Sequence, residues 1–387
     1  MKIAFITDGF QHAVKDNAYK MLKKNFPNAQ IDWIKILDIA KKKRIISIVN
    51  LFFIIKEYWR SYLNSSSPFL FYFFRTTYIF KKMREELTKI IRKEKYDFTF
   101  QMMLMFDASV EGIPHFTYSD VTHLTYKKFP SYNKWRQNSN EWIKLEKEIY
   151  QNANLNFLWS RNIARDMIEL YGISEEKIKV VGVGGNSISE NSHNLTDLKR
   201  YESKIILFVG YDWERKGGPL LYEAFKKVLK YHKDAKLIIV GSNPVIDNLN
   251  GAVKIFGRQN KESTAQFFEK ASIYCMPTLR EPFGLVFVEA MFYYLPIVAW
   301  NMGALPELVE NGKNGFLIDP LNVDELSNKI IELLSSPNIC LQMGKEGRKK
   351  AEVFYDWNLV GQKIKIEIEK NMQEQKAKIF IDKNYKY

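Results

Sequence analysis

Two glutamates frame the segment of the sequence whose residue types are best suited to chemistry. Glu281-Pro-Phe-Gly284 follows an apolar run that ends near Pro277, and Glu289 lies eight residues beyond Glu281. We expect the run to be a strand and the residues after Gly284 to begin a helix. The loop between them is then a candidate binding site, because ligands of open parallel sheets bind where strands end. The free N–H groups and dipole of a helix start favour an anion. Two carboxylates beside an anion site would suit hydroxyl groups or a developing positive charge, and a sugar with its ribose offers both.

A second polar loop carries two cations. The segment Gly210-Tyr-Asp-Trp-Glu-Arg-Lys-Gly-Gly218 follows the apolar run at 204–209 and precedes a helical pattern. Arg215 and Lys216 could therefore hold a diphosphate and stabilise it as a leaving group. Simpler interpretations are a helix-capping loop at Glu281 and a solvated basic turn at Arg215 and Lys216. The presence of both loops in one chain, with Gly303-Ala-Leu-Pro-Glu307 downstream, favours the chemical interpretation.

The elements that would position these loops alternate along the whole chain. Short apolar runs followed by helical patterns predict parallel sheets covered on both faces. Strands are predicted at 3–7, 31–36, 97–101, 115–119, 156–160, 179–182, 204–209, 237–240, 272–275 and 296–299. Helices are predicted at 13–25, 78–92, 141–151, 163–171, 286–293, 323–334 and 356–375. Two more are indicated by the helical pattern from 220 to 229 and by a helix that ends at 271. Residues 376–387 are expected to be a loosely held end.

Composition excludes several classes of protein. With 46% hydrophobic and 26% charged residues, the chain is typical of a globular protein, and 387 residues predict two domains. Two cysteines, Cys275 and Cys340, argue against a disulfide framework and for a reducing cytosol. We see no secretory signal, no apolar run of about 18 residues and no cluster of metal ligands. We therefore expect a cytoplasmic protein that needs no metal.

Residues from about 204 to 337 resemble the donor-binding domain of the retaining glycosyltransferase family 4, which belongs to the glycosyl transferases group 1 and has the GT-B fold. This resemblance implies an α/β protein of two Rossmann-like domains whose parallel sheets face a central cleft. The matching motifs are Phe208-Val-Gly210, Arg215-Lys-Gly217, Ile239-Val-Gly241, Phe256-Gly257, Glu281-Pro-Phe-Gly284, Glu289-Ala-Met291, Pro296-Ile-Val298, Gly303-Ala-Leu-Pro-Glu307 and Asn311-Gly-Lys-Asn-Gly-Phe316.

The resemblance also implies a domain plan. Residues 1–186 would form an acceptor-side Rossmann-like domain, and 187–203 a linker. Residues 204–355 would form the nucleotide-sugar-binding domain. Residues 356–387 would be a helix that returns to the first domain, followed by the tail.

Roles at the donor site follow from the matched motifs. Glu281 is expected to contact the donor sugar near its reacting face, as a catalytic residue. Phe283, Gly284 and Leu285 would offer backbone N–H groups to the diphosphate, and Glu289 would hydrogen-bond the ribose.

The cations complete the expected donor site. Arg215 and Lys216 would neutralise the diphosphate, and Arg258 falls where the family holds the base. Many relatives carry an arginine directly after the strand glycine, where this chain has Tyr211, so fewer cations are expected at the phosphates.

The first half of the chain resembles the family less strongly. The segment 115–124 lies where relatives place a histidine or an aspartate that faces the donor sugar. Asp120 is the first candidate and His123 the second, and each could equally be a structural polar group of a loop. Gly9, in the loop after the first predicted strand, could let the backbone approach donor or acceptor.

Together these features predict transfer of a hexosyl-type group from a nucleotide sugar such as a UDP-sugar to an acceptor hydroxyl, with retention of configuration and without a cofactor. The expected acceptor is a glycan or lipid-linked saccharide of the cell envelope, as in polysaccharide biosynthesis. The alternatives are a nucleotide-sugar epimerase of the same two-domain plan and a non-catalytic membrane-surface binding protein. Nucleic acid is not an expected partner, because no reader motif accompanies the positive charge.

Most of the positive charge lies in one aromatic-rich segment. Residues 41–95 contain 14 Lys and Arg against 4 Glu, in a chain whose net charge is +14. Lys41–Arg44 precede a nearly apolar stretch at 45–55, and Phe69–Phe74 are all apolar or aromatic. One interpretation is a peripheral contact with an anionic membrane, at the inner face of the cell membrane. The other is a core helix with solvated charged ends.

Overall fold

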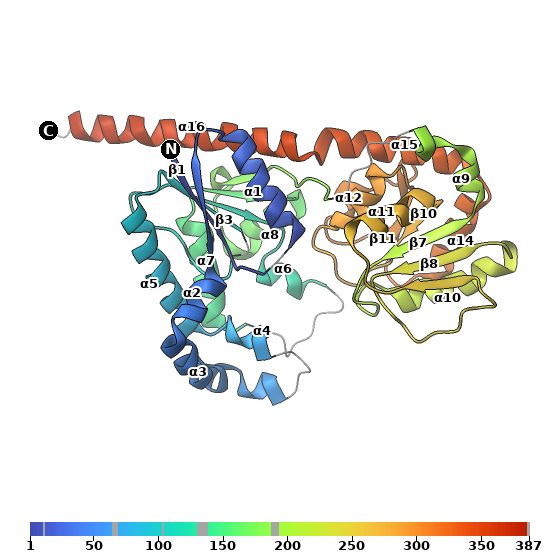
Figure 1. The fold of residues 1–387 in the computed structure, drawn as a ribbon, viewed down its shortest axis with the longest axis horizontal. Helices are drawn as coiled ribbons and strands as arrows, with labels where there is room; N and C mark the ends of the chain where they lie inside the picture. Colours follow the sequence, from blue (N-terminus) through green and yellow to red (C-terminus); the bar gives the residue numbers. More distant parts are fainter. Residues whose placement is uncertain (11, 64–68, 103, 130–137, 187–192, 385–387) are drawn as a thin grey trace. The chain divides into compact units, whose positions relative to one another are not determined.

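The computed structural model describes residues 1–10, 12–63, 69–102, 104–129, 138–186 and 193–384 (Figure 1). The chain divides into two compact units. Unit 1 comprises Met1–Lys128, Tyr132–Gly182 and Val360–Tyr387, and unit 2 comprises Phe129–Ser131 and Val183–Leu359. The chain therefore passes from unit 1 to unit 2 and returns to unit 1 through its last helix.

In the described residues, unit 1 is built on a six-stranded parallel sheet of order β2-β1-β3-β4-β5-β6. Its strands are β1 (Lys2–Thr7), β2 (Gln30–Lys35), β3 (Phe98–Met102), β4 (His115–Ser119), β5 (Leu155–Leu158) and β6 (Ile178–Val180). Its helices are α1 (Ala13–Asn25), α2 (Ile36–Lys42), α3 (Arg44–Leu63), α4 (Phe69–Phe73), α5 (Thr77–Glu94), α6 (His123–Lys127), α7 (Asn140–Asn152), α8 (Arg161–Tyr171), the short 3-10 helix η2 (Glu175–Lys177) and most of α16 (Trp357–Asn384).

Aromatic and aliphatic side chains account for the packing of unit 1. Strands β3, β4 and β5 are buried along their whole length, as expected for parallel strands covered on both faces. Helix α5 buries one stripe at helical spacing and is capped by Thr76, whose side chain accepts the N–H of Ile79. Helix α16 buries Val360, Ile364 and Ile368, one side chain about every turn.

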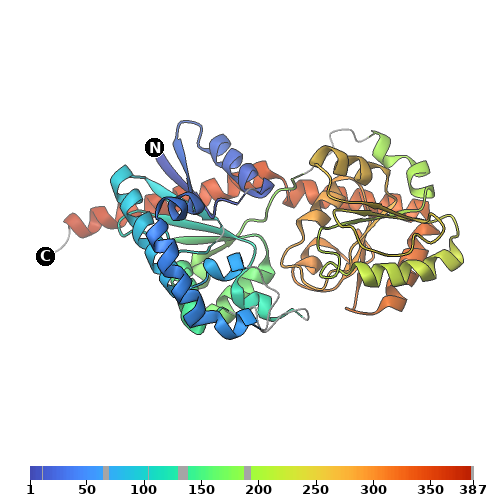
Figure 2. The same cartoon turned by 60° about the horizontal axis from the view of Figure 1, so that its bottom comes forward.

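Unit 2 has the strand order β12-β11-β10-β7-β8-β9, again six parallel strands among the described residues. The strands are β7 (Ile205–Val209), β8 (Lys236–Val240), β9 (Val253–Phe256), β10 (Ile273–Cys275), β11 (Ile297–Trp300) and β12 (Gly315–Ile318). Figure 2 shows helices on both faces of this sheet. They are η3 (His193–Thr196), α9 (Leu198–Glu202), α10 (Gly218–Tyr231), α11 (Lys261–Lys270), α12 (Leu285–Phe292), α13 (Leu305–Leu308), α14 (Val323–Leu334) and α15 (Pro337–Phe354).

Two parts of the structure differ from the sequence-based expectation. Residues 193–203 were predicted as linker, but they form short helices in unit 2, where Arg200 and Tyr201 are buried. Residues 187–192 of that linker lie outside the described residues. The end predicted to be loose from Lys376 is helical up to Asn384. Here the helical pattern simply continues, because the segment contains no glycine or proline to end it.

Strands β9 and β12 and helix α15 were not predicted from the sequence. Strand β9 is only partly buried, so its apolar pattern is weak. Helix α15 contains Gly344 and Gly347, which are poor helix formers. The structure explains Gly344, because a Cβ there would lie 2.1 Å from the carbonyl oxygen of Tyr294. Close packing of α15 requires the glycine that made the helix hard to predict.

Two glycines allow the loops after β7, β10 and β11 to touch. Gly217 has φ 75°, and a Cβ there would lie 1.7 Å from the carbonyl oxygen of Pro277. Gly303 has φ 55°, and its Cβ would lie 2.1 Å from the carbonyl oxygen of Glu281. Both positions need a left-handed backbone and have no room for a side chain. The polar loops identified in the sequence are thus held against one another by backbone contact.

We expect Gly217→Ala to lower the free energy of unfolding of the chain by about 2–3 kcal/mol, because it adds steric overlap with Pro277 to left-handed strain. Gly251→Ala is the matched control. Gly251 also lies in unit 2 with φ 84°, but nothing lies within 4 Å of its Cβ position. Urea unfolding of both variants separates the two contributions. Equal losses would show that the contact with Pro277 adds nothing.

Candidate functional site

The site in unit 2 lies where the strand order reverses. Strands β7 and β10 are neighbours in the sheet. The helices that follow them, α10 and α12, lie in the first and the fourth connection of a Rossmann-type strand order. Ligands of such sheets bind in the crevice at this switch point, beyond the carboxyl ends of the strands. Because the loop 210–217 follows β7 and the loop 276–284 follows β10, both polar loops lie at the switch point.

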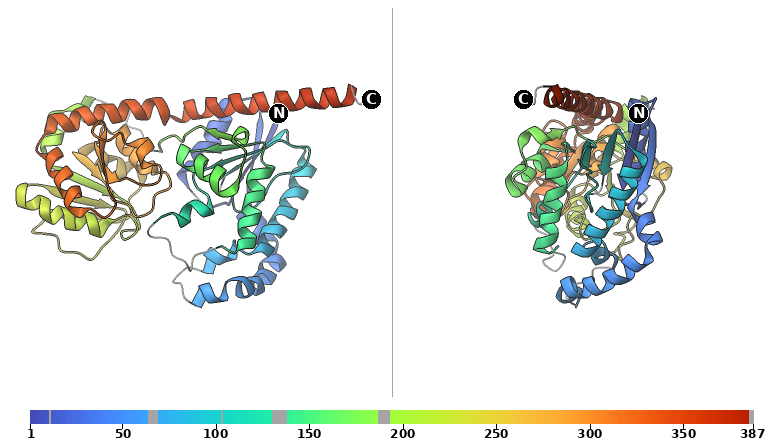
Figure 3. Two further views of the ribbon diagram at one scale, coloured as in Figure 1. Left: turned by 180° about the vertical axis from the view of Figure 1, so that it is seen from behind. Right: turned by 90° about the vertical axis from the view of Figure 1, so that its left-hand side faces the viewer.

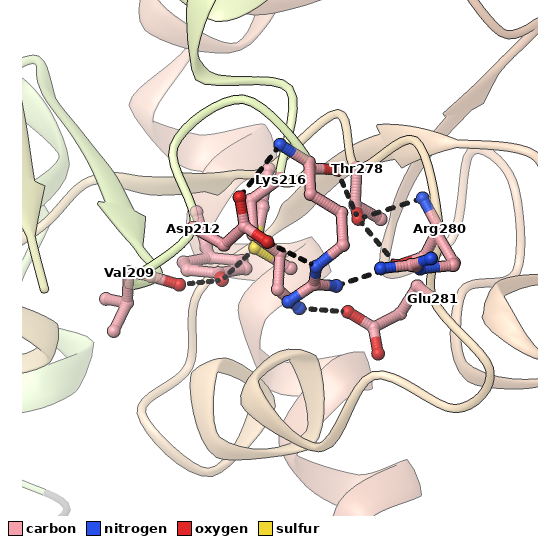
Figure 4. Close-up of polar contacts among 9 residues, drawn as sticks. Val209, Asp212, Lys216, Thr278, Arg280 and Glu281 are labelled. Atoms are coloured by element: carbon pink, nitrogen blue, oxygen red, sulfur yellow. Dashed lines mark hydrogen bonds and ion pairs between the residues drawn. The ribbon is translucent and has the colours of Figure 1, made fainter. Parts of the chain in front are cut away.

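An ion pair joins these two loops. The Lys216 ammonium donates a hydrogen bond to the carboxylate of Glu281, although the residues are 65 positions apart (Figure 4). Glu281 is 8% exposed, and the side chain of Lys216 is 12% exposed. A buried carboxylate requires such a partner, since desolvation of an unpaired charge is costly. A cation and a carboxylate are therefore held together at the switch point.

Arg215 is directed differently from Lys216. Its Nε donates to Asp212 at 2.9 Å, and one terminal nitrogen donates to the carbonyl oxygen of Arg280 at 3.1 Å. Its backbone carbonyl accepts the N–H of Leu279 at 2.8 Å. Arg215 thus links the two loops through hydrogen bonds. The sequence predicted only that it would supply positive charge to a diphosphate.

The start of α12 is suited to an anion. Gly284 is its N-cap with φ 98°, and among the described residues no side chain caps this helix end. Phe283 is buried before it, and Leu285 is the first helical residue. The first N–H groups of a helix have no intrahelical partner, so this end offers donors and the positive end of the dipole. It lies directly after Glu281 in the same loop.

Glu289 lies one turn into α12 and has an unusual environment. It accepts hydrogen bonds from the backbone and the side chain of Asn186. Burial raises the pKa of Glu289 to about 7, while Lys261 and Asn186 oppose that shift. The carboxylate is therefore close to half-ionised at neutral pH, and a hydroxyl donor would favour its charged form.

Arg258 lies on the other side of β7. It follows β9, which is separated from β7 by β8, and it is exposed. Gly257 before it packs against the side-chain amide of Asn243, which a Cβ would approach to 2.7 Å. The structure thus places Arg258 at the carboxyl edge of the same sheet but on the loop after a different strand.

Gly9 lies in unit 1 after β1, with φ 96°. Its loop is held by Lys15, a buried lysine of α1 that donates to the Asp8 carboxylate and, at 2.9 Å, to the carbonyl oxygen of Phe10. The backbone carbonyl of Asp8 accepts the N–H of Leu37 at 2.9 Å. The loop is therefore rigidly anchored at the carboxyl edge of the unit 1 sheet.

Asp120 and His123 follow β4, which is separated from β1 by β3 in the sheet. Asp120 is partly exposed directly after the strand. The Nε2 atom of His123 accepts the backbone N–H of Asn138 at 3.3 Å. Burial, with Lys127 and Arg75 nearby, lowers the pKa of His123 to about 4. His123 is thus neutral at pH 7 and is held in its loop by the contact with Asn138, and the roles of Asp120 and His123 stay predictions.

Glu146, which was not predicted from the sequence, organises this loop. Its carboxylate accepts the hydroxyls of Tyr171 and, at 3.0 Å, Tyr150, together with the N–H of His123 at 3.0 Å. Burial raises the pKa of Glu146 to about 7. An acidic residue within the apolar stripe of α7 was the signal that could have identified it.

Two absences concern the described residues only. Within the parts of the chain that the structure describes, no three His, Cys, Asp or Glu side chains are grouped as metal ligands. In the same residues, none of the helices combines the length and the apolar character needed to cross a membrane.

Comparison with known proteins agrees with this geometry. Residues 196–350 match the family described as Glycosyl transferases group 1. An uncharacterized glycosyltransferase of Haemophilus influenzae is 33% identical over 165 residues, which cover 41% of this chain and 47% of that protein. The chain spans about half the length of the curated relatives it matches first. The part of unit 2 that matches this family includes both loops of the site.

Two solved structures show the fold. Sucrose-phosphate synthase from Thermosynechococcus elongatus has a TM-score of 0.68 at 17% identity, covering 98% of this chain and 99% of that chain. HepE of Anabaena, solved in complex with UDP, also has a TM-score of 0.68 at 17% identity, covering 96% and 100%. The predicted GT-B fold, with two Rossmann-like units, is confirmed.

We expect Lys216→Met to lower the free energy of unfolding by about 1–3 kcal/mol, because it leaves the buried Glu281 carboxylate without its cation. Adding Glu281→Gln should recover part of that loss, so that a double-mutant cycle gives a coupling of about 1 kcal/mol or more. The matched control is the exposed pair Lys227–Asp324, whose coupling should be near zero. A cycle at Lys216–Glu281 as small as the control would contradict a stabilising pair.

Proposed function

We propose that the protein is a glycosyltransferase that transfers a sugar from a nucleoside diphosphate sugar to an acceptor hydroxyl. The observation that carries this proposal is the arrangement of Lys216, Glu281 and the uncapped start of α12 at the switch point of unit 2. A cation and helix-start N–H groups suit a diphosphate, and the adjacent carboxylate suits a sugar. The match of residues 196–350 to glycosyl transferases group 1 supports the same reaction class.

In the proposed donor complex, the diphosphate binds the N–H groups of Phe283, Gly284 and Leu285. Lys216 then exchanges its hydrogen bond with Glu281 for one with a phosphate oxygen, and Arg215 adds positive charge from its place between the loops. This exchange leaves the Glu281 carboxylate available to the donor sugar. The ion pair of the present structure would thus hold the two side chains together until the donor arrives.

The nucleoside side of the donor would be held by two further residues. Glu289 accepts the ribose hydroxyls in place of its present donor, Asn186, and Arg258 lies beside the base. We propose uridine as the base, which the UDP in the HepE structure supports. Asp120 and Gly9, which belong to unit 1, stay proposed site residues in the roles expected from the sequence.

The chemistry follows from these contacts. The bond between the anomeric carbon and the diphosphate oxygen breaks, the acceptor oxygen forms the new bond to that carbon, and the proton of the acceptor hydroxyl passes to the departing diphosphate. Lys216 and the α12 N–H groups stabilise the charge that develops on the leaving diphosphate, while Glu281 stabilises the positive sugar carbon. We propose retention of configuration, as in glycosyltransferase family 4, and an acceptor that is a glycan or lipid-linked saccharide of the cell envelope. No step requires a metal or cofactor.

A panel of nucleotide sugars tests this proposal directly. We expect one donor class to raise the melting temperature and to be hydrolysed slowly without acceptor, releasing nucleoside diphosphate. Conversion of the sugar without release of diphosphate would instead support an epimerase. Failure of every nucleotide sugar to stabilise the protein would contradict the donor site.

Variants separate binding from chemistry. Glu281→Gln should lower the turnover number about 10²–10³-fold with little change in the affinity for nucleoside diphosphate, because the carboxylate acts on the sugar. Lys216→Ala should instead weaken nucleoside diphosphate binding, measured by calorimetry. Lys227→Ala, on the exposed surface of α10, is the control and should change neither quantity. A loss of nucleotide affinity in Glu281→Gln equal to the loss in Lys216→Ala would rule out these separate roles.

The raised pKa of Glu289 predicts a pH dependence. The carboxylate accepts hydrogen bonds from ribose hydroxyls more strongly than the neutral acid does, and below the pKa of about 7 the side chain must first lose a proton. The dissociation constant for the nucleotide should therefore rise up to about tenfold per pH unit as the pH falls from 7 to 5. Glu289→Gln should bind more weakly at pH 8 and lose this part of the dependence. Parallel pH profiles for the two proteins would show that Glu289 does not contact the ribose.

A further inference from the structure

Helix α3 is anchored to unit 1 through polar groups on one side. Asn50 donates to the carbonyl oxygen of Phe73 at 2.7 Å and accepts a hydrogen bond from the hydroxyl of Thr76. Glu57 accepts the N–H of Thr77 at 3.1 Å and its hydroxyl at 2.7 Å. Further along the helix, the Tyr58 hydroxyl donates to the carbonyl oxygen of Arg75 at 2.6 Å. Asn50 and Tyr58 are buried and Glu57 is partly buried, on the side of α3 that faces the α4–α5 corner.

The opposite side of α3 is apolar and open to solvent. Its exposed fractions run from 38% at Val49 to 78% at Ile45, and Phe52 is 64% exposed. The stripe consists of Ile45, Ile48, Val49, Phe52, Ile55 and Trp59, which recur at helical spacing. Figures 1 and 3 show α3 at the margin of unit 1. A surface helix normally turns its apolar face inward, so this reversed arrangement indicates a binding surface.

Cations surround this stripe. Residues 41–60 contain 6 Lys and Arg and one acidic residue, Glu57, which is turned towards Thr77. Lys41, Lys42 and Arg44 are exposed before or at the start of α3, and Lys56 and Arg60 are exposed near its end. The Arg60 guanidinium lies 5.2 Å from the ring centre of Trp59. Positive charge therefore lies at both ends of the apolar stripe.

We propose that this face of α3 binds the surface of an anionic lipid bilayer. The apolar side chains would enter the boundary between headgroups and acyl chains, Trp59 would lie at headgroup level, and the cations would contact lipid phosphates. A helix of 20 residues, about 30 Å long, can lie along the surface with its whole stripe in contact.

The charge distribution favours lipid over the other occupants. Exposed lysines and arginines border this stripe, and the headgroup phosphates of an anionic bilayer would pair with them. A second copy of the chain would bring the same cations face to face around the stripe, and like charges repel. An anionic bilayer satisfies both the apolar area and the positive charge. The proposal concerns adsorption and is independent of the glycosyl transfer proposed above.

Co-sedimentation of the full chain with vesicles tests the proposal. Phosphatidylcholine vesicles that contain phosphatidylglycerol should bind the protein, and pure phosphatidylcholine vesicles should bind it much more weakly. Replacing Lys41, Lys42 and Arg44 with serine should weaken binding to the anionic vesicles about a hundredfold at low salt. Phe52→Glu with Ile55→Glu should weaken it at least about tenfold.

The control variant is Ile366→Glu, an isoleucine on helix α16 that is 63% exposed, against 66% for Ile55. It should bind vesicles as the unchanged protein does. Nucleotide-induced thermal stabilisation should be the same in all variants, since α3 carries no residue of the proposed donor site. Equal binding to neutral and anionic vesicles, no binding, or binding unaffected by the α3 substitutions would overturn the proposal. So would a dimer in solution that the same substitutions abolish, because the stripe would then bind a second copy.

Discussion

The close approach of two loops in unit 2 is the constraint on which the candidate site depends. Gly217 meets the backbone of Pro277 where no side chain fits, and this contact brings Lys216 and Glu281 within hydrogen-bonding distance. Arg215 reinforces it by bonding to Asp212 and to the carbonyl oxygen of Arg280. Because strands β7 and β10 are adjacent, the geometry of the sheet itself brings these loops to one crevice.

The two glutamates of the site differ in the partners that hold them. Glu281 is paired with the Lys216 ammonium group, next to the position proposed for the sugar. Glu289 is held by an amide and a backbone N–H, and its pKa is raised to about 7. Neutral donors can be replaced by ribose hydroxyls at little electrostatic cost, whereas the Lys216–Glu281 pair separates only if another anion reaches the lysine. In the proposed donor complex, the diphosphate must therefore reach Lys216 before Glu281 is released to the sugar.

Much of the fold could be predicted from the sequence, because apolar runs and helical periods are local properties. The strand at 115–119 and the helices at 13–25 and 323–334 were predicted to the residue. Strand β9 and helix α15 escaped prediction, since partial burial and packing glycines weaken the local pattern. Segment 41–60 showed its charge and apolar content in the sequence, but not which side of α3 would be buried. That depended on Asn50, Glu57 and Tyr58 finding partners at the α4–α5 corner.

The sequence by itself determined the residue types of the site and the order of the elements that carry them. The spacing of Glu281, Gly284 and Glu289 is local. It was sufficient to predict that a helix begins after Gly284, with one carboxylate in the loop before it and a second within the helix. Only the tertiary structure decided that Lys216 pairs with Glu281 while Arg215 turns to Asp212. Neighbouring positions on a loop point in different directions, and contacts across 65 residues depend on which strands lie side by side in the sheet.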